Sequence, residues 1–138
     1  MKIGIVGYSA QKFDVSSAKS FIQRAFDLFA SYQPEIVSGL TNMGIPGLAY
    51  QEACKRGWKT VGISCNQALR YDCFPVDDQI IIGEQWGDES QKFLSLIDVL
   101  VRIGGGSQSY QECQMAKDLD KAVIEFDLPA LQTTKNAS

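Results

Sequence analysis

The sequence predicts an α/β fold of three layers, in which helices cover both faces of a mainly parallel sheet. Two observations lead to this class. Short apolar runs alternate along the chain with segments whose apolar residues recur every three or four positions. Several of these runs end directly at glycine, as in "KIGIVG" and "EIVSG". Strands that alternate with helices form right-handed βαβ units, and the resulting parallel sheet is buried on both faces.

The first half of the chain alternates regularly. Residues 2–6 and 35–39 are apolar runs that meet glycine, and each predicts a buried strand. Between them, apolar residues at steps of three and four predict a helix over 18–29. A second helix is expected over 44–57, because proline is favoured in a first helical turn and glycine at a helix end. Residues 59–64 then provide a third strand.

The second half continues this alternation after an irregular stretch. Residues 66–78 contain Pro75 and lack a clear period, so they predict a loop. The other expected elements are a strand over 79–83, an amphipathic helix beginning at Asp88 or Ser90, a strand over 98–103, a helix over 108–119 and a strand over 122–126. We expect one domain over 1–126 and a loosely held tail over 127–138.

Composition and charge restrict the function. The chain has 138 residues, of which 45% are hydrophobic, so it can bury a core. Its net charge of −3 argues against binding nucleic acid through many phosphates. It has no histidine, which excludes Ser-His-Asp and Cys-His catalysis within the chain. Without a signal-peptide or membrane-span pattern, the sequence predicts a cytoplasmic protein with reduced cysteines and no membrane contact.

Three glycine-bearing loops follow predicted strands, at 7–9, 38–44 and 104–109. In open parallel sheets, ligands bind outside the carboxyl ends of the strands. Glycines allow close backbone approach, and the first amides of a following helix attract an anion. We therefore expect a nucleotide-like small molecule whose phosphate is held among Gly7, Tyr8, Ser9, Ser38, Gly39, Thr41, Asn42, Gly44, Gly104, Gly105, Gly106, Ser107, Gln108 and Ser109. Ordinary turns whose serines cap helices are the alternative, and neither a metal nor a resident cofactor is expected.

The stretch "DVLVRIGGGSQSYQE" resembles the PGGxGTxxE motif of LOG-type enzymes, which belong to the SLOG superfamily of Rossmann-like proteins. Those enzymes are nucleotide phosphoribohydrolases. The matching positions are the paired glycines Gly105 and Gly106, Ser109 in place of the Thr, and Glu112. Upstream, "SGLTNMGIPGLAYQEACKRG" resembles the superfamily's second glycine loop and helix, at Gly39, Gly44 and Ala53. The resemblance covers residues 2–126 and implies a Rossmann-like, nucleotide-binding domain that forms a homodimer.

Three positions depart from the LOG-type motif. Gly104 stands in place of the Pro, and Gln108 in place of the second Gly. Glu89 stands where LOG-type enzymes carry an arginine that acts with the motif Glu. A carboxylate cannot bind phosphate as arginine does, which favours a protein that binds a nucleotide or a nucleotide derivative, such as a signal or a molybdopterin-like cofactor. The alternative is a LOG-like phosphoribohydrolase, an N-glycosidase that uses Glu112.

Glu112 has two interpretations from the sequence. The pattern "SYQE" fits a capping box, in which Ser109 precedes a helix and Glu112 lies in its first turn. The other interpretation is a carboxylate that bonds a ribose or stabilises an oxocarbenium-like transition state.

Three large aromatic residues lie near the loops. Tyr8 either stacks on a base or covers the end of the sheet. Trp86 and Tyr110 either flank a base or, the interpretation that we favour, contact the core or a dimer partner. The acidic turn 87–90 indicates either a helix cap, the interpretation that we favour, or metal ligation. Arg102 lies within a predicted strand, and we expect its side chain to point away from the site.

Overall fold

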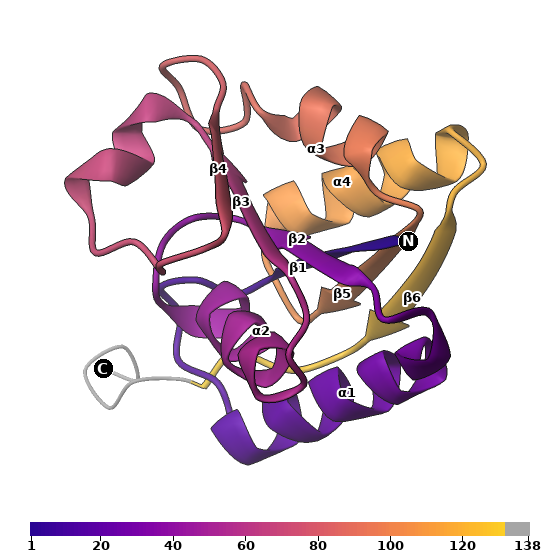
Figure 1. Cartoon of the computed structure of the whole chain (residues 1–138). Helices are drawn as coiled ribbons and strands as arrows, with labels where there is room; N and C mark the ends of the chain where they lie inside the picture. Colours follow the sequence, from indigo (N-terminus) through magenta and orange to yellow (C-terminus); the bar gives the residue numbers. More distant parts are fainter. Residues whose placement is uncertain (132–138) are drawn as a thin grey trace.

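A six-stranded, all-parallel sheet forms the middle layer of the molecule (Figure 1). The computed structural model describes residues 1–131 and confirms the predicted α/β class. The strands are β1 (Lys2–Gly7), β2 (Glu35–Ser38), β3 (Thr60–Ser64), β4 (Asp78–Ile81), β5 (Val99–Ile103) and β6 (Ala122–Phe126). Their order across the sheet is β4-β3-β2-β1-β5-β6.

The helices lie close to their predicted positions. In the described part of the chain they are α1 (Val15–Leu28), α2 (Gly44–Lys55), α3 (Ser90–Leu96) and α4 (Ser107–Asp118). Helix α1 begins directly after Asp14, whose carboxylate accepts a hydrogen bond from the Ser17 amide at 3.2 Å. The stretch predicted as irregular, 66–78, contains one short 3-10 helix, η2 (Asn66–Arg70), and a second one, η1 (Ala30–Tyr32), follows α1.

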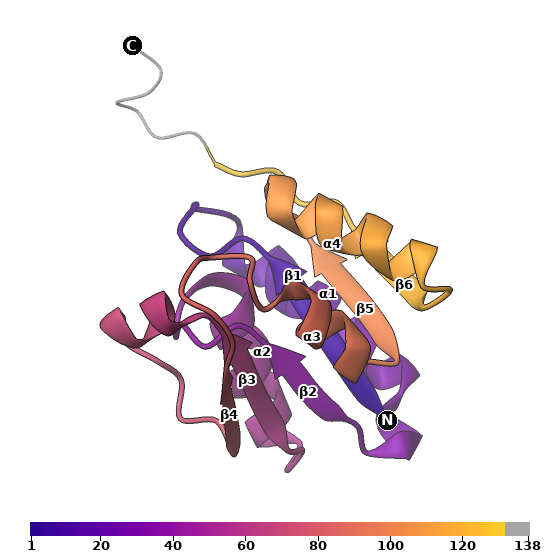
Figure 2. The same cartoon turned by 90° about the horizontal axis from the view of Figure 1, so that it is seen from above.

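Helices α1 and α2 cover one face of the sheet, and α3 and α4 cover the other (Figures 1 and 2). Successive side chains of β1 point to opposite faces of the sheet, so β1 packs against both helical layers. Ile3 and Ile5 are buried against α1 and α2, whereas Val6 packs with the apolar residues of α3 and α4. Gly4 faces α3, and a Cβ there would lie 2.8 Å from the ring of Phe93, so the missing side chain lets α3 pack directly on the sheet.

The strand order creates a switch point between β1 and β5. The chain leaves β1 toward α1 on one face, and it leaves β5 toward α4 on the opposite face. The two connections therefore diverge and leave a crevice outside the carboxyl ends of the strands, which is where open α/β sheets bind ligands. The fold therefore predicts a site at the carboxyl ends of the strands, next to β1 and β5.

The end of β1 is packed too tightly for a side chain. A Cβ on Gly7 would lie 2.3 Å from the carbonyl oxygen of Ile103 and 2.7 Å from Cγ1 of Ile45. Both neighbours are buried, and one is backbone, so neither can move aside easily. Glycine at this position therefore lets β1, β5 and α2 meet at the crevice.

The residues after β6 return across the first loop. Leu128 is buried in the core, and the Tyr8 hydroxyl donates to its carbonyl oxygen at 2.8 Å. The Leu131 amide donates to the carbonyl oxygen of Lys12 at 2.7 Å. Residues 127–131 of the predicted tail are thus in contact with the domain, and residues 132–138 lie outside the described part of the chain. Between residues 1 and 131, no helix is long and apolar enough to cross a membrane.

We predict that Gly7→Ala destabilises the fold. The added methyl group meets backbone and a buried side chain, so the free energy of unfolding should fall by about 1–3 kcal/mol, measured by urea denaturation. Gly39→Ala is the matched control, because a Cβ on Gly39 meets no atom within 4 Å. Equal losses in the two variants would contradict the packing argument.

Candidate functional site

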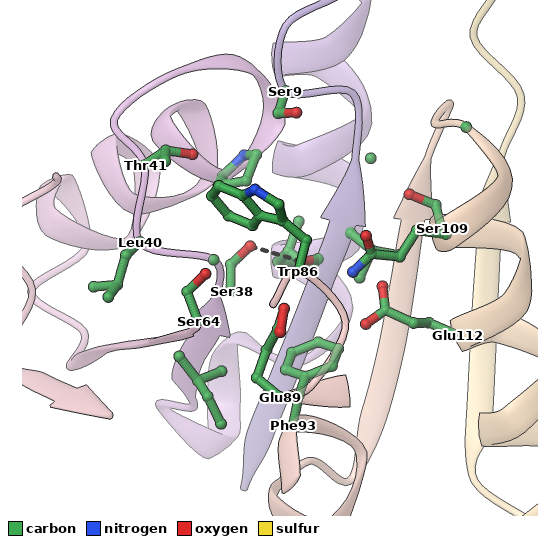
Figure 3. Close-up of a pocket in the computed structure, with 18 of the residues that line it drawn as sticks. Ser9, Ser38, Leu40, Thr41, Ser64, Trp86, Glu89, Phe93, Ser109 and Glu112 are labelled. Atoms are coloured by element: carbon green, nitrogen blue, oxygen red, sulfur yellow. Dashed lines mark hydrogen bonds between the residues drawn. The ribbon is translucent and has the colours of Figure 1, made fainter. Parts of the chain in front are cut away.

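A cavity of about 360 Å³ opens at the carboxyl ends of β1, β2, β3 and β5 (Figure 3). Its walls come from the three glycine-bearing loops, from the end of β3 and from the segment before α3. Among the residues predicted from the sequence, those that line it are Gly7, Ser9, Ser38, Gly39, Thr41, Gly106, Ser107, Gln108, Ser109 and Glu112. The structure therefore brings residues of all three loops together in one cavity.

Five of the predicted residues do not line this cavity, namely Tyr8, Asn42, Gly44, Gly104 and Gly105. The Tyr8 ring stacks on Phe13 at 5.9 Å, and its hydroxyl is bonded to the Leu128 carbonyl, so this side chain covers the sheet end. Asn42 and Gly44 line a separate groove beside the cavity. The Asn42 amide donates to the Asp72 carboxylate at 3.5 Å.

The three consecutive glycines have different surroundings. Gly104 and Gly105 have positive φ angles of 59° and 107°. A Cβ on Gly104 would lie 2.3 Å from the Tyr8 ring, and one on Gly105 would lie 2.5 Å from the Ser109 hydroxyl oxygen. Gly106 lines the cavity, and a Cβ there would meet nothing within 4 Å. The first two glycines shape the turn, and the third borders the space for a ligand.

Helix α4 begins at the cavity wall. Gly106 is its N-cap, and no side chain caps the helix. The amides in the first turn of a helix have no partner within the helix, and its dipole favours a negative charge there. The capping-box interpretation of Ser109 and Glu112 is therefore wrong. The extended backbone of Gly106 starts the helix at Ser107, which moves Glu112 into the second turn.

Glu112 is buried and faces the cavity (Figure 3). Its carboxylate accepts a hydrogen bond from the Ser90 hydroxyl at 3.0 Å. The pKa of this carboxyl is raised from 4.5 to about 7, mainly by burial and also by the nearby charge of Glu89, while the hydrogen bonds from Ser90 and Gln108 oppose the change. Glu112 thus titrates near neutral pH.

Glu89 is the second carboxylate in the cavity. It precedes α3 and has an exposed fraction of only 6%. Its two carboxylate oxygens each lie 3.2 Å from the backbone nitrogen of Gly87. The sequence motif identified Glu89 only as a replacement for an arginine. The sequence did contain one indication of its role. Glu89 lies in the acidic turn 87–90, directly before α3, and α3 covers the same face of the sheet as α4.

Several residues that line the cavity are not among the site residues predicted from the sequence. Ser64 ends β3 and lies in the cavity, which follows from β3 standing next to β2 in the sheet. Trp86 and Phe93 add aromatic surface, and Trp86 is about half exposed. Trp86 thus lines the cavity and also lies against the Tyr71 ring, with the ring centroids 6.0 Å apart. Tyr110 is exposed, lies against Arg102 and does not line this cavity.

Two hydrogen bonds hold the loop after β2 in place. The Ser38 hydroxyl donates to the Ile5 carbonyl oxygen at 2.7 Å (dashed line in Figure 3). The buried Tyr50 hydroxyl lies 2.8 Å from the carbonyl oxygen of Gly39 and 3.0 Å from that of Val61. Burial raises the pKa of Tyr50, so its hydroxyl stays protonated and can donate. These bonds hold Ser38 and Gly39 against the sheet and α2.

Among residues 1–131, no lysine and no arginine lines the cavity. Arg102 is buried beside β6, where it pairs with Glu125 at 3.1 Å and with Asp127 at 2.8 Å. Its guanidinium also stacks over the Tyr110 ring at 4.3 Å. The prediction that Arg102 points away from the site is confirmed. The cavity therefore offers helix amides and hydroxyl groups on one side and two carboxylates on another.

A parallel sheet with a polar cavity at its switch point is the arrangement of Rossmann-like ligand-binding proteins. The chain is similar to the molybdenum cofactor binding protein from the phototrophic bacterium Rippkaea orientalis, with 26% identity, a TM-score of 0.74 and coverage of 91% of this chain and 76% of that one. The protein TM1055 is 25% identical, with a TM-score of 0.72 over 88% of this chain and 71% of its own.

The molybdenum cofactor carrier protein from Chlamydomonas reinhardtii has the same fold. Its TM-score is 0.72 at 19% identity, over 90% of this chain and 74% of that one. No protein-family model matches the sequence, and a search of curated proteins finds no match. Solved structures therefore connect this fold to proteins that bind a small-molecule cofactor.

We predict that Glu112→Gln stabilises the protein at alkaline pH. The folded state holds the Glu112 proton with a pKa of about 7 rather than 4.5, so wild-type stability falls as pH rises from about 4.5 through 7. Glutamine cannot ionise. The variant should unfold like wild type at pH 4 and be more stable by up to about 3 kcal/mol at pH 8, measured by urea denaturation.

Glu84→Gln serves as the control, because it removes the same charge from an exposed position. The measured quantity is the stability difference between Glu112→Gln and wild type at each pH. If this difference is the same at pH 8 as at pH 4, Glu112 is ionised in the folded protein at neutral pH.

Proposed function

We propose that this chain is a binding or carrier protein of the SLOG type for a phosphate-bearing pterin or nucleotide-like ligand, with the molybdenum cofactor as the leading candidate. The observation that carries the proposal is the similarity to the molybdenum cofactor binding protein of Rippkaea orientalis, which extends over 91% of this chain at 26% identity. The cavity described above is large enough for a single heterocycle with a phosphate group.

The phosphate of such a ligand would lie at the start of α4. Gly106 leaves the space open, and the first-turn amides and the hydroxyls of Ser107 and Ser109 border it. Helix N-termini bind phosphate through such amides without any basic side chain. This placement agrees with a cavity to which the described part of the chain contributes no lysine and no arginine.

The same lack of a basic residue supports binding rather than catalysis. A phosphoribohydrolase must stabilise the departing base and bind the phosphate, and in LOG-type enzymes an arginine acts with the motif glutamate. Here Glu89 borders the cavity instead. A second carboxylate cannot replace the positive charge, so we infer that the ligand is held and passed on unchanged.

Hydrolysis of an N-glycosidic bond is the second candidate, and one observation favours it. Glu112 has a pKa of about 7 beside another carboxylate, and pairs of carboxyl groups with different proton affinities serve glycoside hydrolysis as acid and base. If the protein hydrolyses nucleoside monophosphates, free base should appear on incubation, and Glu112→Gln should abolish its release while leaving nucleotide affinity nearly unchanged.

We predict that Gly106→Leu blocks ligand binding without harming the fold. Residue 106 has an ordinary φ of −100° and open space around its Cα, so the side chain should occupy the cavity rather than disturb the protein. Affinity for the molybdenum cofactor, followed as molybdenum that co-elutes with the protein in gel filtration, should fall by more than about tenfold.

Gly106→Ala is the graded control and should lose less than about threefold in affinity, because its methyl group is small. The melting temperatures of both variants should stay close to that of wild type. The proposed site would be incorrect if Gly106→Leu bound the cofactor as tightly as wild type.

A further inference from the structure

We propose that Glu89 and Glu112 recognise the donor edge of a 2-amino-4-oxopyrimidine ring, the ring that guanine and pterins share. This inference rests on the proposed function and adds to it the orientation and the ring chemistry of the ligand. The phosphate end would face the start of α4, and the ring would lie against the two carboxylates.

The first step is that both carboxylates lack sufficient partners. Glu89 and Glu112 are each more than nine-tenths buried, and both turn their carboxylates into the cavity from different elements (Figure 3). In the described residues, the Glu89 carboxylate receives only the Gly87 amide, and the Glu112 carboxyl receives the Ser90 hydroxyl and the Gln108 side chain. Each carboxylate has about four acceptor positions. Buried charge without partners is costly, so a ligand rich in N–H donors fits this wall of the cavity.

A second, independent observation comes from two hydroxyl groups. Ser64 and Ser109 are more than nine-tenths buried, and both line the cavity. Within residues 1–131, neither hydroxyl oxygen has a hydrogen-bond partner, although no fully enclosed polar atom is left unsatisfied. Their hydroxyls therefore open onto the cavity and remain free to bond a polar molecule placed there.

Aromatic and apolar surface makes room for a planar ring. The Trp86 indole extends over the cavity, with Glu89 and Glu112 below it (Figure 3). Pro46 and Phe93 contribute apolar lining nearby. A flat heterocycle can stack on the indole while its edge reaches the carboxylates, since Tyr and Trp side chains bind rings through their faces.

The hydrogen-bonding pattern then selects the ring. A 2-amino-4-oxopyrimidine presents an amino N–H, a ring N–H and a carbonyl oxygen side by side on one edge. A carboxylate such as Glu89 can accept the two donors together. Burial keeps the Glu112 carboxyl partly protonated at neutral pH, because its pKa is raised to about 7, and in that form it can donate to the carbonyl oxygen. Adenine has no ring N–H, and hypoxanthine has no amino group.

The experiment compares nucleotides that differ only in this edge. Binding of GMP, IMP and AMP to the intact chain is measured by Trp86 fluorescence in a Trp58→Phe background, in which Trp86 is the remaining tryptophan. We expect GMP to bind at least about tenfold more tightly than IMP or AMP. Glu89→Gln should weaken GMP most, because GMP loses an acceptor for both its amino group and its ring N–H, and should weaken IMP less, because IMP has only the ring N–H. The preference for GMP should therefore fall. Glu84→Gln, on the surface, should retain it.

The outcomes separate the two proposals. Equal affinity for the three nucleotides, or tighter binding of AMP, would overturn the ring assignment while leaving a phosphate-binding site. Failure of GMP, the molybdenum cofactor and neopterin monophosphate to bind at all would overturn the proposed function as well. With the GMP preference present, neopterin monophosphate distinguishes the source of the ring, and tighter binding of it than of GMP identifies a pterin rather than a nucleotide.

Discussion

The close approach of backbone around the end of β1 is the constraint on which the site depends. A side chain on Gly7 would collide with the Ile103 carbonyl oxygen, and a Cβ on Gly44 would lie 2.3 Å from the Tyr8 carbonyl oxygen. Gly104 and Gly105 in turn pack against Tyr8 and Ser109. Because all these contacts require glycine, three loops that are distant in sequence can converge, and they bring the start of α4 and the end of β2 to one cavity.

The cavity formed where the three loops converge has two sides of opposite electrostatic character. The start of α4 contributes unpaired amides and the positive end of a helix dipole, which suit an anion. Glu89 and Glu112, by contrast, repel one and raise the cost of burying it nearby. A ligand with a single chemical character would satisfy only part of this surface. The arrangement suits a molecule that is anionic at one end and rich in N–H donors at the other.

Sequence patterns predicted the elements well because apolar periodicity reports burial directly, and the parallel-sheet rule placed the three loops together. They did not show which of the consecutive glycines faces the cavity, since this depends on the positive φ angles of Gly104 and Gly105. The "SYQE" pattern misplaced Glu112, because a glycine N-cap starts α4 earlier. Ser64 was missed because its place follows from strand order, which local sequence does not encode.

The opposite end of the sheet, at the amino ends of its strands, is free of this site. The turns that enter β2, β3 and β6 lie there, and the whole length of the strands separates them from the cavity. Gly57, in the turn before β3, has open space around it. A fluorescent label or a short peptide inserted at this end would leave the ligand site intact. Because the cavity lies at the carboxyl ends of the strands, their amino ends are available for attaching a reporter group.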